Sequence, residues 1–364
     1  MKKTAKRVAR QRMILGLMLL CVVLSAGMLA RPAGDIPLFG YEYDNGLPVA
    51  ERGPHERVGS TFRDDGFIQD PESGFTRLQD VILLPPPDHI PPEINSRARV
   101  TPQYLEQLMD FTYVRTRIFL EDPSTMLLPG DIDVYEFIHA DLRIDPTAPG
   151  PHVLIFHTHS TEWFIDTERY NPATGIVVVG RYLAHVLSEH YGLEVLHYTG
   201  SFDMPDGRPQ VMGAYCRMEP VITALLAENP EIQLVIDLHR DGVRDGVGPF
   251  TRYVDGLPTA QLMFFNGLSR RNVNGQPVPT AWLPNPFQRE NLQFSFQAQL
   301  AANQLFPGLN RRIYLRAYRF SLHMHPRSIF VEVGNQYNTL QEAKNAMHPL
   351  ARILADVLLA GDYS

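Results

Sequence analysis

The sequence predicts an α/β domain with a mainly parallel sheet flanked by helices, preceded by a membrane anchor and a small helical N-terminal extension. From residue 151 onward, short apolar runs alternate with amphipathic stretches of helical length, a pattern typical of parallel sheets. Near the N-terminus, a long apolar run follows a basic cluster. These features divide the chain into four parts: 1–30, 31–95, 96–150 and 151–364.

The composition excludes several classes of protein. The formal net charge is -7, whereas a nucleic-acid-binding protein usually carries a surplus of basic residues. The hydrophobic fraction of 44% is ordinary for a globular protein, and aromatic and β-branched residues are too frequent for a disordered chain. The sequence contains only two cysteines, Cys21 and Cys216, which excludes a zinc site built from cysteines. Any metal site must therefore use histidines and carboxylates.

Residues 1–30 are predicted to form a basic cytoplasmic head and a transmembrane anchor. The apolar run over 13–30 follows six basic residues, Lys2, Lys3, Lys6, Arg7, Arg10 and Arg12. At about 1.5 Å per residue, a helix over this run is long enough to span a bilayer. The basic cluster places the N-terminus in the cytoplasm and the rest of the chain outside. A cleaved signal peptide is the alternative, although Met28 and Arg31 fit a cleavage site at Ala30 poorly.

The two segments that follow differ in their predicted order. Residues 31–95 are rich in glycine, proline and charge without a sustained period, which predicts a proline-rich spacer. Residues 96–150 are predicted to form a small N-terminal subdomain, because apolar residues lie near helical spacing between 102 and 120. The sequence leaves open whether this segment is a helical subdomain or a surface for a partner.

Residues 151–364 contain the elements of the predicted sheet. Buried strands are predicted over 153–156, 193–197, 232–238, 260–265, 313–317 and 328–333. Helices are predicted over 177–190, 211–228 and 288–305. Thr339 and Glu342 match a capping box, so a C-terminal helix should begin there. Pro349 should kink or divide that helix.

The carboxyl ends of three predicted strands carry residues suited to metal chemistry. Functional groups gather at this edge in parallel α/β sheets. The residues are His157, His159 and Glu162 after the first strand, Asp237, His239, Arg240 and Asp241 at the end of the third, and Glu332 in the last. Zinc in hydrolases favours three histidine or carboxylate ligands and one open position for water. The pattern therefore predicts a zinc hydrolase.

Four of these residues are assigned the central roles. His159, Glu162 and His239 are predicted to bind zinc, and Glu332 is predicted to move the proton of the attacking water. His159 and Glu162 are three residues apart, close enough to reach one ion from a tight turn. Glu332 lies in an apolar run, so its carboxylate should be protonated, paired or near a metal. A pairing with one of the many arginines is the alternative.

Three flanking residues are assigned supporting or substrate-contacting roles. If the first strand continues, His157 lies on the face of the first ligand and is a ligand, a support for a ligand or a substrate contact. Otherwise it is a structural histidine. Asp237 falls on the same strand face as His239 and is predicted to support that histidine. Arg240 is predicted to support the site or contact substrate, and a surface ion pair with Asp241 is the alternative.

Five stretches of the chain, in order, resemble the stage II sporulation protein P family. The first is the run 153–162, which ends in His157-Thr158-His159-Ser160-Thr161-Glu162. The others are 235–241, 306–309, 330–335 and 338–343. The N-terminal anchor and the proline-rich spacer also suit this family. The resemblance covers about residues 100–360.

The resemblance implies a function in the cell wall. The family is similar to the zinc-dependent N-acetylmuramoyl-L-alanine amidases, which cleave the amide between the lactyl group of muramic acid and L-alanine in peptidoglycan. Endopeptidase activity on peptide cross-links is also attributed to it. It acts in engulfment during endospore formation, with stage II sporulation proteins D and M as partners. Residues 151–364 would then be a zinc amidase domain held outside the cytoplasm at the cell membrane.

The resemblance also implies residue roles. By alignment, His159 and His239 take the places of the two histidine ligands, and Glu332 takes that of the catalytic glutamate. The better-known amidases carry their glutamate ligand near the start of the following helix, where this chain offers none. Glu162 is therefore the predicted ligand, and Glu168 is the alternative.

Two other functions stay open at this point. A zinc carboxypeptidase-like hydrolase would use the same types of residue. A non-catalytic wall-binding scaffold would keep the fold, but degenerate relatives usually lose one of the metal residues. The presence of His159, His239 and Glu332 favours an enzyme.

Overall fold

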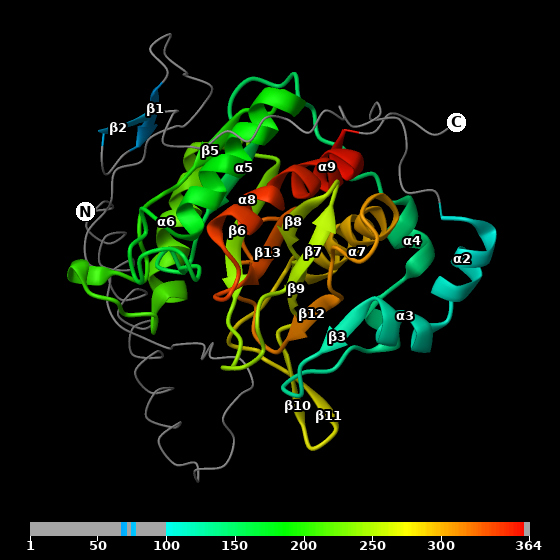
Figure 1. Cartoon of the computed structure of the whole chain (residues 1–364). Helices are drawn as coiled ribbons and strands as arrows, with labels where there is room; N and C mark the ends of the chain where they lie inside the picture. The colour runs from blue at the N-terminus through cyan, green and yellow to red at the C-terminus, as the bar shows by residue number, and fades with distance from the viewer. Residues whose placement is uncertain (1–66, 71–73, 78–99, 360–364) are drawn as a thin grey trace, which may run out of the picture.

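A computed structural model describes residues 67–70, 74–77 and 100–359 of the chain. At its centre, seven strands form one sheet in the order β3-β12-β9-β13-β6-β4-β5 (Figure 1). The strands are β3 (Phe119–Glu121), β4 (Val153–Phe156), β5 (Val195–His197), β6 (Leu234–Asp241), β9 (Leu262–Gly267), β12 (Ile313–Arg316) and β13 (Ser328–Asn335). All neighbouring strands are parallel except β9 and β13. The predicted mainly parallel sheet is confirmed.

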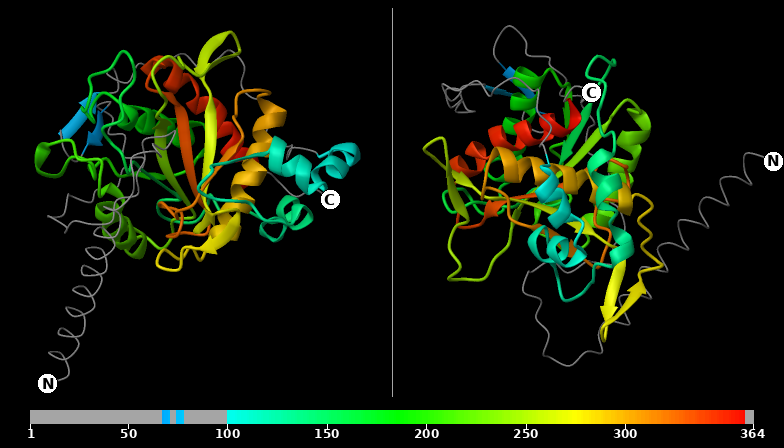
Figure 2. Two further views of the ribbon diagram at one scale, coloured as in Figure 1. Left: turned by 90° about the horizontal axis from the view of Figure 1, so that it is seen from below. Right: turned by 90° about the vertical axis from the view of Figure 1, so that its right-hand side faces the viewer.

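Helices cover both faces of this sheet (Figure 2). One face packs against α5 (Ile176–Tyr191), α7 (Gln288–Leu305), α8 (Leu340–Asn345) and α9 (Met347–Leu358), and the other packs against α6 (Ala214–Glu228). Strand β4 shows why both faces of the sheet must be covered by helices. Val153 and Ile155 belong to the core of the first face, whereas Leu154 and Phe156 belong to that of the second. A strand that is apolar on both sides is typical of a parallel sheet between helix layers.

The predicted helices of the main domain are present with small changes at their ends. Helix α7 has the predicted bounds, and α5 extends one residue beyond the prediction at each end. Helix α6 begins at Ala214 rather than at residue 211. The preceding residue, Gly213, has a φ of 82°, a left-handed conformation that a right-handed helix cannot include.

The C-terminal helix begins and divides as predicted. The Thr339 side chain accepts a hydrogen bond from the backbone N–H of Glu342, and the Glu342 carboxylate accepts one from the N–H of Thr339. Helix α8 ends at Asn345, and Pro349 is the third residue of α9. Because proline has no N–H and its ring clashes with the carbonyl four residues earlier, the helix cannot pass Asn345 unbroken.

The segment before the main domain contributes to the sheet. It contains α2 (Pro102–Leu108), α3 (Phe111–Arg117) and α4 (Val134–His139), as well as the short 3-10 turn η2 (Pro129–Asp131). Strand β3 follows α3 and pairs in parallel with β12 at one edge of the sheet. Leu108, Val114 and Phe119 are buried in the same apolar core as β4 and α5. Helices α2 and α3 lie within the stretch 102–120 where helical spacing was noted, whereas α4 and the edge strand β3 were not predicted.

Three hairpins were not predicted. The hairpin of β7 (Thr251–Val254) and β8 (Leu257–Ala260) turns at Asp255-Gly256, and that of β10 (Arg270–Val273) and β11 (Gln276–Pro279) turns at Asn274-Gly275. All four turn residues have positive φ, as expected for tight two-residue hairpin turns. The third hairpin, β1 (Phe67–Asp70) with β2 (Gly74–Arg77), falls within the predicted spacer.

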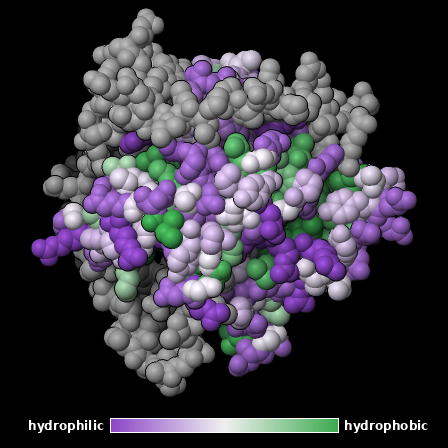
Figure 3. All heavy atoms as spheres, viewed as in Figure 1, coloured by the Kyte–Doolittle hydropathy of each residue, from purple (hydrophilic) through white to green (hydrophobic). Residues whose placement is uncertain are grey.

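The predicted membrane anchor over 13–30 lies outside the described residues. Among the helices that the structure does describe, none combines the length and apolar character needed to cross a bilayer. The face seen in Figure 3 carries mostly hydrophilic side chains, with apolar ones in small groups between them. Apolar surface scattered in this way is ordinary for a folded protein.

Candidate functional site

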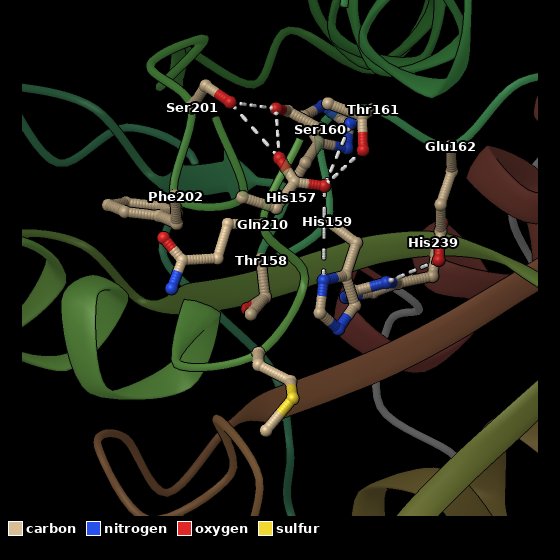
Figure 4. A network of polar contacts seen from close by, with 12 residues as sticks. His157, Thr158, His159, Ser160, Thr161, Glu162, Ser201, Phe202, Gln210 and His239 are labelled. Atoms are coloured by element: carbon tan, nitrogen blue, oxygen red, sulfur yellow. Dashed lines mark hydrogen bonds and ion pairs between the residues drawn. The ribbon is translucent and has the colours of Figure 1, made fainter. Parts of the chain in front are cut away.

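The carboxyl ends of β4, β6 and β13 bring the predicted site residues together. Strand β6 pairs in parallel with β4 on one side and with β13 on the other. The second pairing places Glu332 directly opposite His239. The turn after β4 carries His159 and Glu162 to the same edge, where the Glu162 side chain points toward His239 (Figure 4). The structure therefore gathers the four residues assigned the central roles.

His239 is held in one orientation by its neighbours. Its Nε2 lies 2.7 Å from Oδ1 of Asp237, and its Nδ1 lies 3.4 Å from Oε1 of Glu162. The ring stacks on Phe330, with the ring centres 4.2 Å apart and the planes 4° from parallel. Burial alone would lower the pKa of His239, but Asp237 and Glu162 raise it well above its ordinary value. The Nδ1 atom of His239 therefore points toward Glu162, the other proposed ligand next to it.

Asp237 links β6 to the turn after β4. Its Oδ1 accepts a hydrogen bond from the backbone N–H of Thr158 (2.9 Å), and its Oδ2 accepts one from the Thr158 hydroxyl (2.7 Å). Burial opposes the charged form, yet His239 and these hydrogen bonds lower the pKa of Asp237. A carboxylate in this position keeps a proton of His239 on Nε2, so that loss of the second proton leaves Nδ1 as a donor atom for a metal.

Glu162 is anchored through its other carboxylate oxygen and through its backbone. Oε2 accepts a hydrogen bond from the backbone N–H of Arg240 at 2.8 Å. The Glu162 carbonyl accepts one from the N–H of Ile176 in the first turn of α5 at 2.9 Å. Although burial acts against it, His239 and then Arg240 lower the pKa of Glu162 to about 2. The side chain is therefore an ionised carboxylate at neutral pH.

His159 packs beside these residues in a buried position. Its ring lies edge-on to that of His239, with the centres 5.3 Å apart, and edge-on to Tyr215 at 5.5 Å. Burial lowers the pKa of His159, and the neighbouring His239 lowers it further. A neutral imidazole is the form in which histidine binds metals.

Glu332 is buried beside the other site residues, with 3% of its surface exposed. Its Oε2 has no hydrogen-bond partner within the described part of the chain. Burial raises the pKa of Glu332 well above its ordinary value, and the nearby Asp241 and Glu162 raise it further. No ion pair joins Glu332 to an arginine among the residues described, so that alternative is wrong. A carboxyl group with this environment can hold a proton near neutral pH.

His157 lies apart from the proposed ligands. Strand β4 ends at Phe156, so the condition that would have put His157 on the ligand face is not met. Its Nδ1 lies 2.7 Å from the carbonyl of Leu238, and its Nε2 lies 2.9 Å from Nε2 of His197. The side chain is fully buried, and burial lowers its pKa to about 4. These contacts indicate a structural role, in which His157 joins the turn after β4 to β5 and β6 within the core.

Arg240 and Asp241 do not form the surface ion pair that the sequence left open, because both are buried. The Asp241 carboxylate accepts instead from Nη1 of Arg311 at 2.6 Å. Arg240 donates from Nε to the carbonyl of Trp163 and stacks its guanidinium over the Trp163 ring at 5.1 Å. The alternative ligand Glu168 is exposed, and its carboxylate accepts from Asn171.

The sequence reasoning missed Asp203. This residue lies on the loop after β5, and its side chain is fully buried against the turn that carries His159. Its Oδ2 lies 4.0 Å from Nδ1 of His159. The only sequence signal was its place after a predicted strand, since β5 ends at the same edge of the sheet as β4.

The proposed ligands, His159, Glu162 and His239, offer the nitrogen and carboxylate oxygen atoms that zinc binds in proteins. Within the described ranges, no three His, Cys, Asp or Glu side chains are grouped closely enough to hold a metal ion as they stand. The separation of 3.4 Å between His239 Nδ1 and Glu162 Oε1 is long for a hydrogen bond. It equals the spacing of about 3.4 Å expected for two ligands that each lie about 2.1 Å from a tetrahedral zinc ion. These two atoms are thus spaced as ligands of one ion would be.

Comparison with known proteins places the chain in a family. Residues 129–355 match the family model of stage II sporulation protein P (SpoIIP). The chain belongs to the stage II sporulation protein P family. Stage II sporulation protein P of Bacillus subtilis (strain 168) is 22% identical over 220 residues, which are 56% of this chain and 50% of that protein. The chain thus spans about half the length of this curated relative.

Solved structures of amidases are more distantly similar to this member of the family. The catalytic domain of CwlV, an N-acetylmuramoyl-L-alanine amidase from Bacillus (Paenibacillus) polymyxa var. colistinus, is 10% identical with a TM-score of 0.34. The match covers 57% of this chain and 96% of that domain. An N-acetylmuramoyl-L-alanine amidase from Clostridium difficile 630 is 12% identical with a TM-score of 0.34, and the match covers 58% and 95% of the two chains.

Proposed function

We propose that this protein is a peptidoglycan hydrolase that works with zinc, and that its reaction is that of an N-acetylmuramoyl-L-alanine amidase. One observation carries the proposal. Three strand ends bring two histidines and Glu162 together beside Glu332, a buried carboxyl group whose Oε2 has no hydrogen-bond partner among the described residues. Membership of the stage II sporulation protein P family supports peptidoglycan as the substrate.

Each residue has a defined part in this reaction. His159, Glu162 and His239 would hold the zinc ion, which when bound makes a water molecule acidic enough to attack an amide. Asp237 keeps the proton of His239 on Nε2, so that Nδ1 is available to the metal. In its ionised form, Glu332 accepts a proton from the attacking water and passes it to the nitrogen of the leaving amine.

We extend the proposal to the setting of the protein. The segment over 13–30 anchors the chain in the cell membrane and leaves the domain outside the cytoplasm, where the wall lies. The protein acts in wall remodelling during engulfment, together with stage II sporulation proteins D and M. Endopeptidase activity on peptide cross-links is a further activity of the same site.

The test is digestion of purified sacculi by the full-length protein, read by mass spectrometry, with and without a zinc chelator. We expect release of stem peptides that the chelator abolishes. Glu332→Gln should retain bound zinc and slow the release by about 100-fold or more, the usual contribution of a general base. Glu290→Gln, at an exposed position on α7, is the matched control and should leave the rate unchanged. Peptide release at the normal rate by Glu332→Gln would show that Glu332 is not the catalytic group.

The products separate the competing functions. An amidase leaves free lactyl groups on the glycan, whereas a carboxypeptidase-like enzyme releases free C-terminal amino acids. A scaffold without activity releases neither, even in the presence of zinc. His239→Ala should lower the bound zinc measured by elemental analysis, and an unchanged zinc content would remove His239 from the set of ligands.

A further inference from the structure

The carboxylate of Asp203 accepts several hydrogen bonds beside the candidate metal site. Its Oδ2 accepts from the backbone N–H of Thr161 (3.1 Å) and from the Thr161 hydroxyl (2.5 Å). Its Oδ1 accepts from the hydroxyls of Ser160 (2.8 Å) and Ser201 (3.1 Å). Dashed lines mark these bonds at Ser160, Thr161 and Ser201 in Figure 4. Two of the donors lie between His159 and Glu162, so one side chain fixes the turn that joins both proposed ligands.

Asp203 also faces one of those ligands directly. Its Oδ2 lies 4.0 Å from Nδ1 of His159, and both side chains are buried. Among the described residues, no lysine or arginine forms an ion pair with Asp203. A buried carboxylate without a cationic neighbour is costly. A metal ion bound to His159 would supply the missing positive charge.

The backbone that carries Asp203 is fixed from the opposite side. Its carbonyl accepts from the N–H of Gln210 at 2.7 Å, which closes the loop on itself. The Arg217 guanidinium, on α6, donates to the carbonyls of Phe202 (2.5 Å), Gln210 (2.6 Å) and Met212 (2.8 Å). The loop is thus tied to α6, and Asp203 presents its carboxylate from a rigid support.

We propose that Asp203 is a positioning residue of the metal centre, which sets the turn from His159 to Glu162 and orients the His159 ring before the metal binds. A carboxylate beside Nδ1 favours the proton on that nitrogen and leaves Nε2 as the donor atom. The inference rests on the proposed function, because it assumes that His159 and Glu162 bind zinc. It adds a second carboxylate beside the other histidine, at 4.0 Å from Nδ1 of His159 rather than the 2.7 Å between Asp237 and His239.

The test compares Asp203→Asn with Asp206→Asn in the full-length protein. Asp206 is an exposed residue of the same loop, in the 3-10 turn η3 (Pro205–Gly207), and serves as the matched control. Zinc affinity is measured by competition with a chromophoric chelator. Asp203→Asn should bind zinc about 10- to 100-fold more weakly, the usual cost of losing a carboxylate behind a metal ligand. Asp206→Asn should bind zinc as the wild type does.

A second variant keeps the inference testable if Asp203→Asn does not fold. Thr161→Val removes one donor to the carboxylate and should weaken zinc binding by a smaller factor, with little further effect in the Asp203→Asn background. At saturating zinc, Asp203→Asn should regain most of the wild-type rate, because the residue places the ligands and does not touch the substrate. Wild-type zinc affinity in both variants would overturn the role of Asp203 alone. A wild-type protein that binds no zinc would overturn the proposed function, and this inference with it.

Discussion

Gly175 is the residue that allows the turn after β4 to approach α5. A Cβ atom at this position would lie 2.1 Å from the carbonyl oxygen of Glu162, whereas real Cβ contacts almost never fall below 3.0 Å. In Gly175→Ala the two backbones must therefore separate by about 0.9 Å or more. The shift acts on the residue whose carboxylate is a proposed zinc ligand.

The structure gives the size of the expected effect. The Glu162 carbonyl would lose its 2.9 Å hydrogen bond with Ile176, and Oε2 would lose or stretch its 2.8 Å bond with Arg240. Overpacking of this kind typically costs about 1–3 kcal/mol of folding free energy. Displacement of a proposed ligand by nearly 1 Å should also weaken zinc binding, by about 10-fold or more.

Urea unfolding and zinc competition measure the two effects separately. Gly130→Ala is the matched control, because a Cβ at Gly130 meets no atom within 4 Å. We expect Gly175→Ala to unfold at a lower urea concentration than Gly130→Ala and to hold zinc more weakly. If the two variants unfold together and bind zinc equally well, Glu162 does not depend on this close approach and its assignment as a ligand loses support.

Two further predictions concern stability away from the site. Thr339→Ala should lower the free energy of unfolding by about 1 kcal/mol, because it removes the side-chain half of a capping box, and an unchanged urea midpoint would contradict this. Burial, together with His190 and His185, lowers the pKa of His348 to about 4. The unfolded chain binds that proton near pH 6.5, so stability should fall by about 2 kcal/mol as the pH falls from 6.5 to 4. His348→Asn should flatten this slope in urea titrations, and an unchanged slope would refute the assignment.

The sequence predicted most of the central sheet because its strands are buried on both faces. Such strands appear as unbroken apolar runs, as in 153–156 and 232–238. Strand β3 was not predicted because it is three residues long and directly follows a helix. It is too short to show an alternation of apolar and polar residues. The β7–β8 and β10–β11 hairpins turn at Asp-Gly and Asn-Gly, which are hairpin signals that a search for apolar runs does not reveal.

Within the site as well, some residues could be predicted from the sequence and one could not. His159, His239 and Glu332 could be brought together from sequence because each lies near or after the carboxyl end of a strand, and parallel strands end at one edge. Asp203 could not, because its position depends on the path of an irregular loop. That path is set by the contacts of Arg217 with three backbone carbonyls, which no periodic pattern records.

The edge strand β3 has a consequence for how the domain can be divided. The match to the family begins at residue 129, after β3 has ended, and the predicted main domain begins later still. A protein begun at either point would leave the backbone N–H and carbonyl groups along one side of β12 without partners. An open edge of this kind tends to recruit strands from other copies of the chain and leads to aggregation. A start before α2, near residue 100, keeps β3 paired with β12 and keeps Leu108, Val114 and Phe119 in the core.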